Sequence, residues 1–246
     1  MNYLYLLVDF FTILIPFIFS FHKKIRFNKF FLDFYKASFI VAVLFLIWDA
    51  TFTKMGIWNF NPRYVIGFYV LGLPIEEILF FFCIPFSCVF TYFCIDRFYN
   101  LKWNRNFENA FCIILSMGLI VVGVIFLNRW YTSVTFISTG IICLALQFIF
   151  RISWFGKAVT VYAILLIPFL IVNGILTGTG IPEAVVRYNN AENLNFRILT
   201  IPFEDIFYGF EMFLLNLYLF KYFAGKQLAM SRSINREYSF DPSKTV

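Results

Sequence analysis

Long apolar runs alternate with shorter polar stretches along the whole chain. Each run approaches the ~20 residues that cross a bilayer as a helix, and none shows the strict alternation of the ~10-residue strands of an outer-membrane barrel. The pattern predicts an all-α fold, a polytopic membrane helical bundle with seven transmembrane helices. The runs are centred on residues 3–21, 37–53, 75–95, 110–127, 132–150, 158–176 and 202–222.

Composition indicates that lipid is the solvent for much of the surface. Of the 246 residues, 61% are hydrophobic and only 14% are charged, whereas about 25% are charged in an ordinary soluble domain. A water-soluble globular protein is therefore excluded. The first run lacks a basic start and a small-residue cleavage site and contains Asp9, so we interpret it as the first span and not as a cleaved signal peptide.

Positive charge is concentrated on one side of the predicted bundle. Fifteen of the 20 Lys and Arg residues follow the first, third, fifth and seventh runs, and five lie on the opposite side. Because cytoplasmic loops carry the excess of Lys and Arg, we expect the N-terminus outside the cell and the C-terminus in the cytoplasm. The net charge of +6 fits this distribution, and no nucleic-acid partner is expected.

An internal repeat relates the two halves of the chain. Residues 74–80 and 202–208 share the pattern P-x-E-[ED]-I-x-aromatic at an offset of 128, and Asp49 aligns with Asn173 at an offset of 124. Because four spans separate the copies, both enter the membrane in the same direction, as parallel repeats do. The predicted organisation is a first three-helix repeat (1–109), a linker transmembrane helix (110–127), a second three-helix repeat (128–223) and a cytoplasmic tail (224–246).

Acidic residues are concentrated at the starts of the third and seventh runs. A carboxylate in a span costs about 2.5–3.5 kcal/mol near the bilayer centre, so such residues are interpreted as functional by default. Glu76 and Glu77 are adjacent and point about 100° apart on a helix. We therefore expect an acid of this pair to approach Glu204 or Asp205 across the repeat axis, with Glu211 deeper on the Glu204 face.

A simpler interpretation is that these acids cap two helices at the level of the lipid headgroups, with Arg63 or Arg197 reaching in from the outer loops. The doubled motif and the depth of Glu211 argue against it. In a dry site a neighbouring carboxyl favours the protonated form, whereas a helix N-terminus favours the anion. One acid would then stay protonated beside an ionised one, which supplies a general acid and a general base in one cavity.

Aromatic residues make up 23% of the chain, and Phe80–Phe82 directly follow the first acidic pair. A cavity walled by ring faces can stabilise a cation by up to about 2 kcal/mol per desolvated ring. No nucleotide- or diphosphate-binding motif occurs, the five cysteines form no C-x-x-C pair, and the single histidine is His22. We therefore expect neither a metal nor a cofactor.

Each half of the chain contains sequence motifs that form one recognisable set. The first half contains Trp48-Asp49, Gly56–Gly67 and Leu73–Phe81, and the second contains Gly178–Ile181 and Arg197–Gly209. This set resembles the small membrane lycopene cyclases, which occur as two separate subunits or as one fused chain. The resemblance covers about residues 3–222 and indicates the fused form.

The resemblance implies a redox-neutral isomerisation in the bilayer. A proton adds to the terminal alkene of a linear carotenoid, the chain closes onto the neighbouring double bond, and proton loss gives a β-ring, which converts lycopene to γ- or β-carotene. The expected location is a bacterial inner membrane, with other carotenoid enzymes as expected partners. The implied acid and base set is Glu76, Glu77, Glu204 and Asp205, with substrate-binding and supporting roles for Asp49, Phe80, Tyr208, Glu211 and Arg197.

Two other functions fit the same pattern. Repeated three-helix units with intramembrane acids also describe proton-coupled transporters, and a related cyclase could act on another prenyl chain. A carrier should contain Gly- or Pro-interrupted helices near the midplane, whereas Pro74 and Pro202 lie at helix starts. The sequence leaves open which acid donates the proton, whether one or both carotenoid ends are closed, and the oligomeric state.

Overall fold

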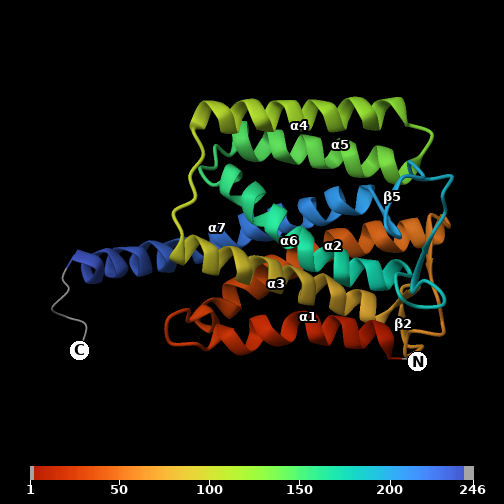
Figure 1. Ribbon diagram of the computed structural model, residues 1–246, viewed down its shortest axis with the longest axis horizontal. Coiled ribbons are helices and arrows are strands. Elements are labelled where there is room, and N and C mark those ends of the chain that lie inside the picture. The colour runs from red at the N-terminus through yellow and green to blue at the C-terminus, as the bar shows by residue number, and fades with distance from the viewer. Residues whose placement is uncertain (1–2, 241–246) are drawn as a thin grey trace.

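The computed structural model describes residues 3–240, and over this range the chain folds into seven α-helices and six very short strands (Figure 1). A short 3-10 helix, η1 (Phe27–Phe30), leads into the second α-helix, and a π-helical turn, η2 (Ala145–Ile149), extends the fifth. The α-helices are α1 (Leu4–Ser20), α2 (Phe31–Lys54), α3 (Ile75–Phe98), α4 (Arg105–Ile125), α5 (Trp130–Leu144), α6 (Phe155–Thr177) and α7 (Glu204–Phe240).

The helices have the length and surface of membrane spans. Within the described residues, five segments are long and apolar enough to cross a bilayer, and α1 is apolar but has only 17 residues. Large side chains such as Phe11, Leu32 and Ile114 are exposed, which in a protein of this composition marks contact with lipid. The chain is therefore a polytopic helical membrane protein. The five segments are Phe27–Lys54, Ile75–Phe98, Arg105–Ile125, Trp130–Ile149 and Phe155–Thr177.

Helix α7 continues beyond the predicted end of the second repeat. It reaches Phe240, whereas the apolar run ends near residue 222. The end of the apolar pattern is therefore not the end of the helix. Residues 241–246 of the expected tail lie outside the described part of the chain.

The short strands lie in the segments that lead into α3 and α7, at one end of the bundle (Figure 1). Hydropathy gives no sign of them, because strands of two or three residues are too short to show a period. We refer to this end as the strand end. All pairs are antiparallel: β1 (Trp58–Phe60) with β4 (Val186–Tyr188), β2 (Tyr69–Val70) with β3 (Leu73–Pro74), and β5 (Arg197–Ile198) with β6 (Ile201–Pro202).

Each strand of the first half has a counterpart 128 residues later. The pair formed by β1 and β4 places Asn59 opposite Arg187, two positions that are themselves 128 apart. An antiparallel pair of equivalent strands is what an approximate two-fold axis generates. Leu71 and Leu199, at equivalent turn positions, have positive φ of 54° and 59°. The offset found in the sequence is therefore also an offset between matching pieces of backbone.

Polar contacts reinforce the junction between β1 and β4. The Glu183 carboxylate accepts hydrogen bonds from Asn61 Nδ2 at 2.8 Å and from Arg187 Nη2 at 2.6 Å, and Arg63 Nη1 lies 3.7 Å from its other oxygen. The hydrogen bond from Asn61 and the charges of the two arginines hold the pKa of this carboxyl below its ordinary value of 4.5. Glu183 thus ties the two halves together outside the apolar part of the bundle.

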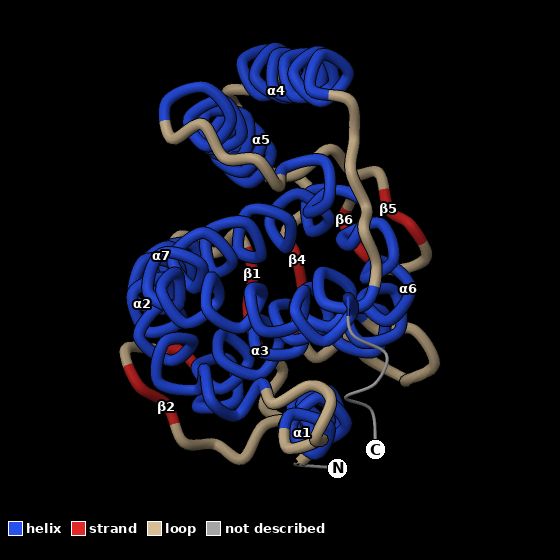
Figure 2. Tube along the Cα trace, turned by 90° about the vertical axis from the view of Figure 1, so that its left-hand side faces the viewer, coloured by secondary structure: helices blue, strands red, loops and turns tan. Residues whose placement is uncertain are grey.

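The helices pack in matching ways in the two halves. Helix α1 packs on α3 as α5 packs on α7, and α2 contacts both α3 and α7. Helix α4 packs against α5, and Figure 2 shows α4 at the outer edge of the bundle, beyond α5. Glycines allow their close approach: a Cβ added to Gly140 would lie 2.7 Å from Ile120 Cγ1, and one added to Gly123 would lie 2.7 Å from Ile137 Cγ1.

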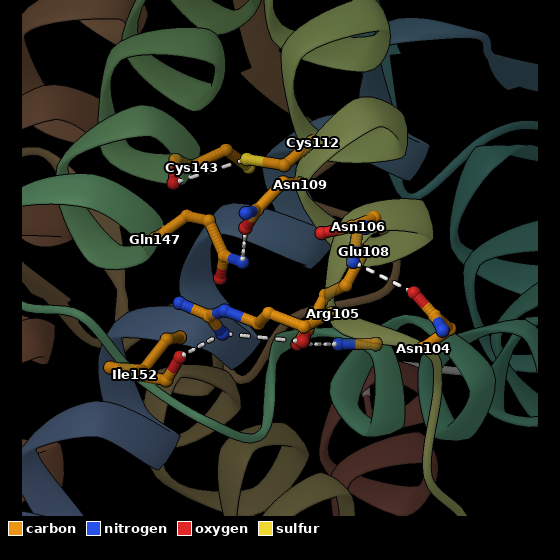
Figure 3. A network of polar contacts seen from close by, with 10 residues as sticks. Asn104, Arg105, Asn106, Glu108, Asn109, Cys112, Cys143, Gln147 and Ile152 are labelled. Carbon is orange, nitrogen blue, oxygen red and sulfur yellow. Dashed lines mark hydrogen bonds and ion pairs between the residues drawn. The ribbon is translucent and has the colours of Figure 1, made fainter.

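A polar network fixes the opposite end of α4 and α5 (Figure 3). Gln147, in the π-helical turn, donates from Nε2 to Asn109 Oδ1 at 2.7 Å, and Arg105 Nη1 donates to the carbonyl oxygen of Ile152 at 2.8 Å. The extra residue of a π turn shifts the side chains that follow it. Here the turn directs the buried amide of Gln147 at Asn109 of α4. Helix α4 is therefore held to α5 both at this end and near Gly123.

Aromatic rings fill the core away from the strand end. Phe27 is fully buried, and its ring centroid lies 5.6 Å from that of Phe86, 5.1 Å from that of Phe93 and 5.6 Å from that of Phe220. Ring pairs in such arrangements contribute about 0.5–1.5 kcal/mol each beyond the area they bury. Part of the phenylalanine excess is therefore structural and has no bearing on chemistry.

Candidate active site

A cavity lies among α1, α3, α6 and α7, next to the β1–β4 pair, with about 120 Å³ of free space. Carboxyl, amide and hydroxyl groups gather on its wall near the strand end, and apolar side chains line the rest. The polar wall is formed by Tyr5, Asp49, Trp58, Glu77, Tyr131, Asn173, Tyr188, Asp205 and Tyr208. The apolar wall includes Phe60, Phe80, Ile84, Leu165, Phe169, Val172, Leu176 and Met212.

One acid of each predicted pair lines this cavity, and it is the second acid in both cases. Glu77 is 8% exposed and accepts a hydrogen bond at Oε2 from the Tyr5 hydroxyl at 2.5 Å. Asp205 is 3% exposed and comes from the equivalent position of the other half. Two carboxyl groups from the two copies of the motif therefore share one enclosed, mainly apolar space.

Asp205 is held by three donors. The Tyr131 hydroxyl donates to Oδ1, and Asn173 Nδ2 and the Tyr188 hydroxyl donate to Oδ2 at 2.8 and 3.1 Å. Tyr188 lies in β4, outside the spans, where burial and the neighbouring Asp205 raise the pKa of its hydroxyl well above the ordinary value of 10.0. Tyr188 therefore keeps its proton and remains a donor to Asp205.

The first acid of each pair has different contacts. Glu76 and Glu204 are both 0% exposed and do not line the cavity. Glu76 Oε1 accepts from the backbone N–H of Ile66, and Glu204 Oε1 accepts from that of Leu194, both at 2.6 Å. The Thr132 hydroxyl also donates to Glu204 Oε1 at 2.6 Å. These carboxyl groups fasten the chain segments before β2 and β5 to the starts of α3 and α7.

Two of the predicted supporting residues line the cavity with their rings. Tyr208 forms edge contacts with Phe45 at 5.0 Å and Trp48 at 5.2 Å between ring centroids. Phe80 lines the cavity one turn below Glu76. Asp49 also lines it and accepts a hydrogen bond at Oδ1 from Trp58 Nε1 at 2.5 Å.

The other two supporting residues lie outside the cavity. Glu211 accepts from the Ser138 and Thr139 hydroxyls at 2.6 and 2.9 Å, which joins α7 to α5. Arg197, in β5, donates to the Thr200 carbonyl oxygen and to Asn190 Oδ1, each at 2.6 Å. These contacts fix helix and loop positions.

No basic side chain neutralises the paired acids among the described residues. Arg63 forms an ion pair with Glu183, and Arg197 donates to oxygens of neutral groups. All four paired acids are buried inside the protein. Within the described part of the chain, no group of three or more His, Cys, Asp or Glu side chains could hold a metal ion.

Five residues of the polar wall were not identified from the sequence as site residues: Tyr5, Trp58, Tyr131, Asn173 and Tyr188. Asn173 was visible only as a departure from Asp49 in the repeat, yet it donates to Asp205. The tyrosines carry no motif of their own. A search for hydroxyl donors near the start of the first helix of each half would have found Tyr5 and Tyr131.

Fold and site together define a class of protein: a helical membrane protein whose two halves each contribute a buried carboxyl group to one aromatic cavity. A family model described as lycopene cyclase matches residues 2–95 and 128–223. The chain therefore belongs to the lycopene cyclase family and is an isomerase-type enzyme. The matched segments fall in the two halves, and the whole of α4 lies between them. Comparison with curated proteins and with solved structures gives no match.

Proposed function

We propose that this chain is a lycopene β-cyclase that closes the linear end groups of lycopene to give γ- and β-carotene. The observation that carries the proposal is the meeting of Glu77 and Asp205, one from each half, at a single aromatic-lined cavity. Addition of a proton to an alkene requires an acid in a dry site, and the product requires a base to remove a proton. The family supplies a carotenoid as the lipid-soluble substrate.

The proposal includes a topology. All seven α-helices cross the membrane, the strand end faces outward with the N-terminus, and the C-terminus lies in the cytoplasm. Residues 1–109 and 128–223 are parallel three-helix repeats joined by the linker helix at 110–127. The charge distribution and the matching strand pairs of the two halves support this arrangement.

The cavity fits the end of a carotenoid better than a whole one. Its ~120 Å³ is below the about 300–1,000 Å³ typical of sites that enclose a complete drug-sized ligand. One end group would enter beside the acids while the rest of the forty-carbon chain remains among helices and lipid. No water-soluble carrier is needed, because the substrate never leaves the hydrocarbon phase.

The number of hydrogen bonds to each carboxyl group indicates which is the proton donor and which is the base. Among the described residues, Glu77 accepts one hydrogen bond, from Tyr5, whereas Asp205 accepts three. Donors to a carboxylate stabilise its ionised form. We therefore assign Glu77 as the acid that protonates the terminal double bond and Asp205 as the base that accepts the ring proton.

Ring faces stabilise the intermediate cation. The terminal double bond takes the proton of Glu77 and becomes a carbocation. The neighbouring double bond attacks this cation and closes the ring, and the ring cation then loses a proton to Asp205. Phe80, Trp58 and Tyr208 line the space between the acids, and each desolvated ring can contribute up to about 2 kcal/mol to a cation. In this assignment Glu76, Glu204, Glu211 and Arg197 position helices and loops.

The test is conversion in a bacterial host that accumulates lycopene. The intact chain should change the red pigment to yellow or orange, and chromatography should identify γ- or β-carotene. Glu77→Gln and Asp205→Asn should leave the cells red while the protein remains in the membrane. Red cells with the parent chain present at normal level in the membrane would contradict the proposal; formation of a different cyclic prenyl product would assign the site to another substrate.

A further inference from the structure

Asp9 is an unusual residue of the first helix because its carboxyl group is buried and makes no hydrogen bond among the described residues. It lies in the apolar α1, is 1% exposed, and neither carboxyl oxygen has a hydrogen-bond partner among the described residues. A buried carboxyl group without a partner is strongly unfavourable in protein and in lipid, so it is retained only where it has a use. The acids and bases assigned above do not include it.

Asp9 lies close to the proposed proton donor. It is one helical turn after Tyr5, whose hydroxyl donates to Glu77 Oε2 at 2.5 Å, and residues four apart share a helix face. Thr12, three residues further on, lines the cavity as Tyr5 does. The titratable groups within electrostatic reach of Asp9 are Tyr5 on its own helix and Glu76, Glu77 and Cys83 on α3.

The second half shows that the fold does not need this acid. Tyr5 contacts Glu77 as Tyr131 contacts Asp205, so the first helices of the two halves correspond at an offset of 126. The residue equivalent to Asp9 is then Thr135, which is also buried. Helix α5 packs on α7 with a threonine at the position where α1 packs on α3 with a carboxyl group.

The reaction supplies a use for a third acid. Glu77 gives its proton to the substrate in each cycle, and the ring proton goes to Asp205 on another wall of the cavity. Until the product leaves, hydrocarbon fills the space between them, and hydrocarbon does not conduct protons. Glu77 must therefore be reprotonated from its own side of the cavity, where Tyr5 and Asp9 lie.

We propose that Asp9 is the proton reserve that restores Glu77 after each cyclisation, acting through the Tyr5 hydroxyl. The Tyr5 proton passes to Glu77 Oε2 while the Tyr5 oxygen receives the Asp9 proton, after rotation of the Asp9 side chain or through one water. Glu77 becomes neutral and Asp9 becomes an anion. Asp205 then releases the ring proton to water, and Asp9 takes up a proton from water. These two steps complete the cycle with no net change in protons. This inference rests on the proposed cyclase function. Asp9 does not touch the substrate and acts only by returning a proton to Glu77.

The experiment compares single and repeated turnovers of the purified full-length protein in lipid vesicles with lycopene as the probe. With enzyme in excess, Asp9→Asn and Asp9→Thr should convert lycopene at a rate close to that of the parent, because Glu77 starts protonated. With lycopene in excess, both variants should be slower by about tenfold or more, the lower part of the range of general acid–base effects. Asp9→Glu should restore repeated turnover.

The threonine variant guards against loss of the fold, because it places in α1 the residue that α5 carries at the equivalent position. Asp33→Asn, at the start of α2, is the matched control and should behave as the parent in both regimes. Equal slowing of single and repeated turnovers in the Asp9 variants, or no slowing in either, would overturn the proposal. Failure of the parent to convert lycopene at all would instead overturn the cyclase function itself.

Discussion

Adjacent glutamates at the start of α3 offer the sharpest test of the site. Glu76 and Glu77 are both buried and consecutive in the chain, yet one accepts a hydrogen bond from a backbone N–H and the other lines the cavity. The substitutions Glu76→Gln and Glu77→Gln make the same chemical change, a carboxyl group to an amide of the same shape, at consecutive positions of the chain. Any general effect of replacing a buried carboxyl group should therefore appear in both variants.

The expected magnitudes differ because the contacts differ. Glu77→Gln removes the proton donor, and loss of general acid catalysis costs about 10²–10⁴ in rate, or about 3–5 kcal/mol in the barrier. Glu76→Gln keeps an oxygen that accepts the Ile66 N–H, now bonded at 2.6 Å. A neutral hydrogen bond contributes about 0.5–1.5 kcal/mol, so even weakening it fully should lower stability by only about 1 kcal/mol, with little change in rate.

The assay measures the rate of pigment conversion and thermal unfolding of both purified variants in the same lipid vesicles. Glu77→Gln should retain the thermal midpoint of the parent to within a few degrees and lose conversion. Glu76→Gln should unfold about 2–4 °C earlier for its ~1 kcal/mol and retain most of the conversion. If a well-folded Glu76→Gln were as inactive as Glu77→Gln, the division of the acidic pair into a loop anchor and a proton donor would be refuted.

Further substitutions test single contacts. Asn173→Leu removes one of three donors to Asp205 and should slow conversion about tenfold, equivalent to ~1.4 kcal/mol. An unchanged rate would show that the Asn173 amide does not support Asp205 as the base. Gly140→Leu drives a side chain into Ile120 Cγ1, which a Cβ already approaches to 2.7 Å, and should lower the unfolding free energy by about 1–3 kcal/mol, as measured by thermal unfolding. Because the folded pKa of Glu183 lies below 4.5, its stabilising contribution is present above that pH and is lost as pH falls through the lowered pKa. Glu183→Gln should therefore flatten the decline of the thermal midpoint as pH falls from above 4.5 through the lowered pKa, and an unchanged decline would argue against the β1–β4 tie.

Hydropathy and the repeated motif predicted a large part of the fold. The seven apolar runs each contain a helix, and the P-x-E-[ED] segments lead into α3 and α7. The family assignment is confirmed by the match over both halves. The six short strands were missed, because their hydrogen bonds join residues in loops where no periodic pattern can form.

The candidate site was predicted as a set of acids without their separate contacts. The sequence identified Glu76, Glu77, Glu204 and Asp205 and the need for a partner across the repeat. It did not distinguish the loop anchors from the cavity acids, because that depends on the rotation of α3 and α7 about their axes. The donors from α1 and α5 to Glu77 and Asp205 lie more than 70 residues away in the chain.

The sequence by itself determined that this chain spans a membrane as helices, that it is built twice, and that acids stand at two helix starts. These follow from local composition, since lipid requires every backbone group to be bonded within its own helix. Only the tertiary structure decided which acid of each pair lines the cavity, which hydroxyl groups reach it and that Asp9 is buried near Glu77. Those depend on how helices rotate and pack against one another, and packing is a property of side chains brought together from distant parts of the chain.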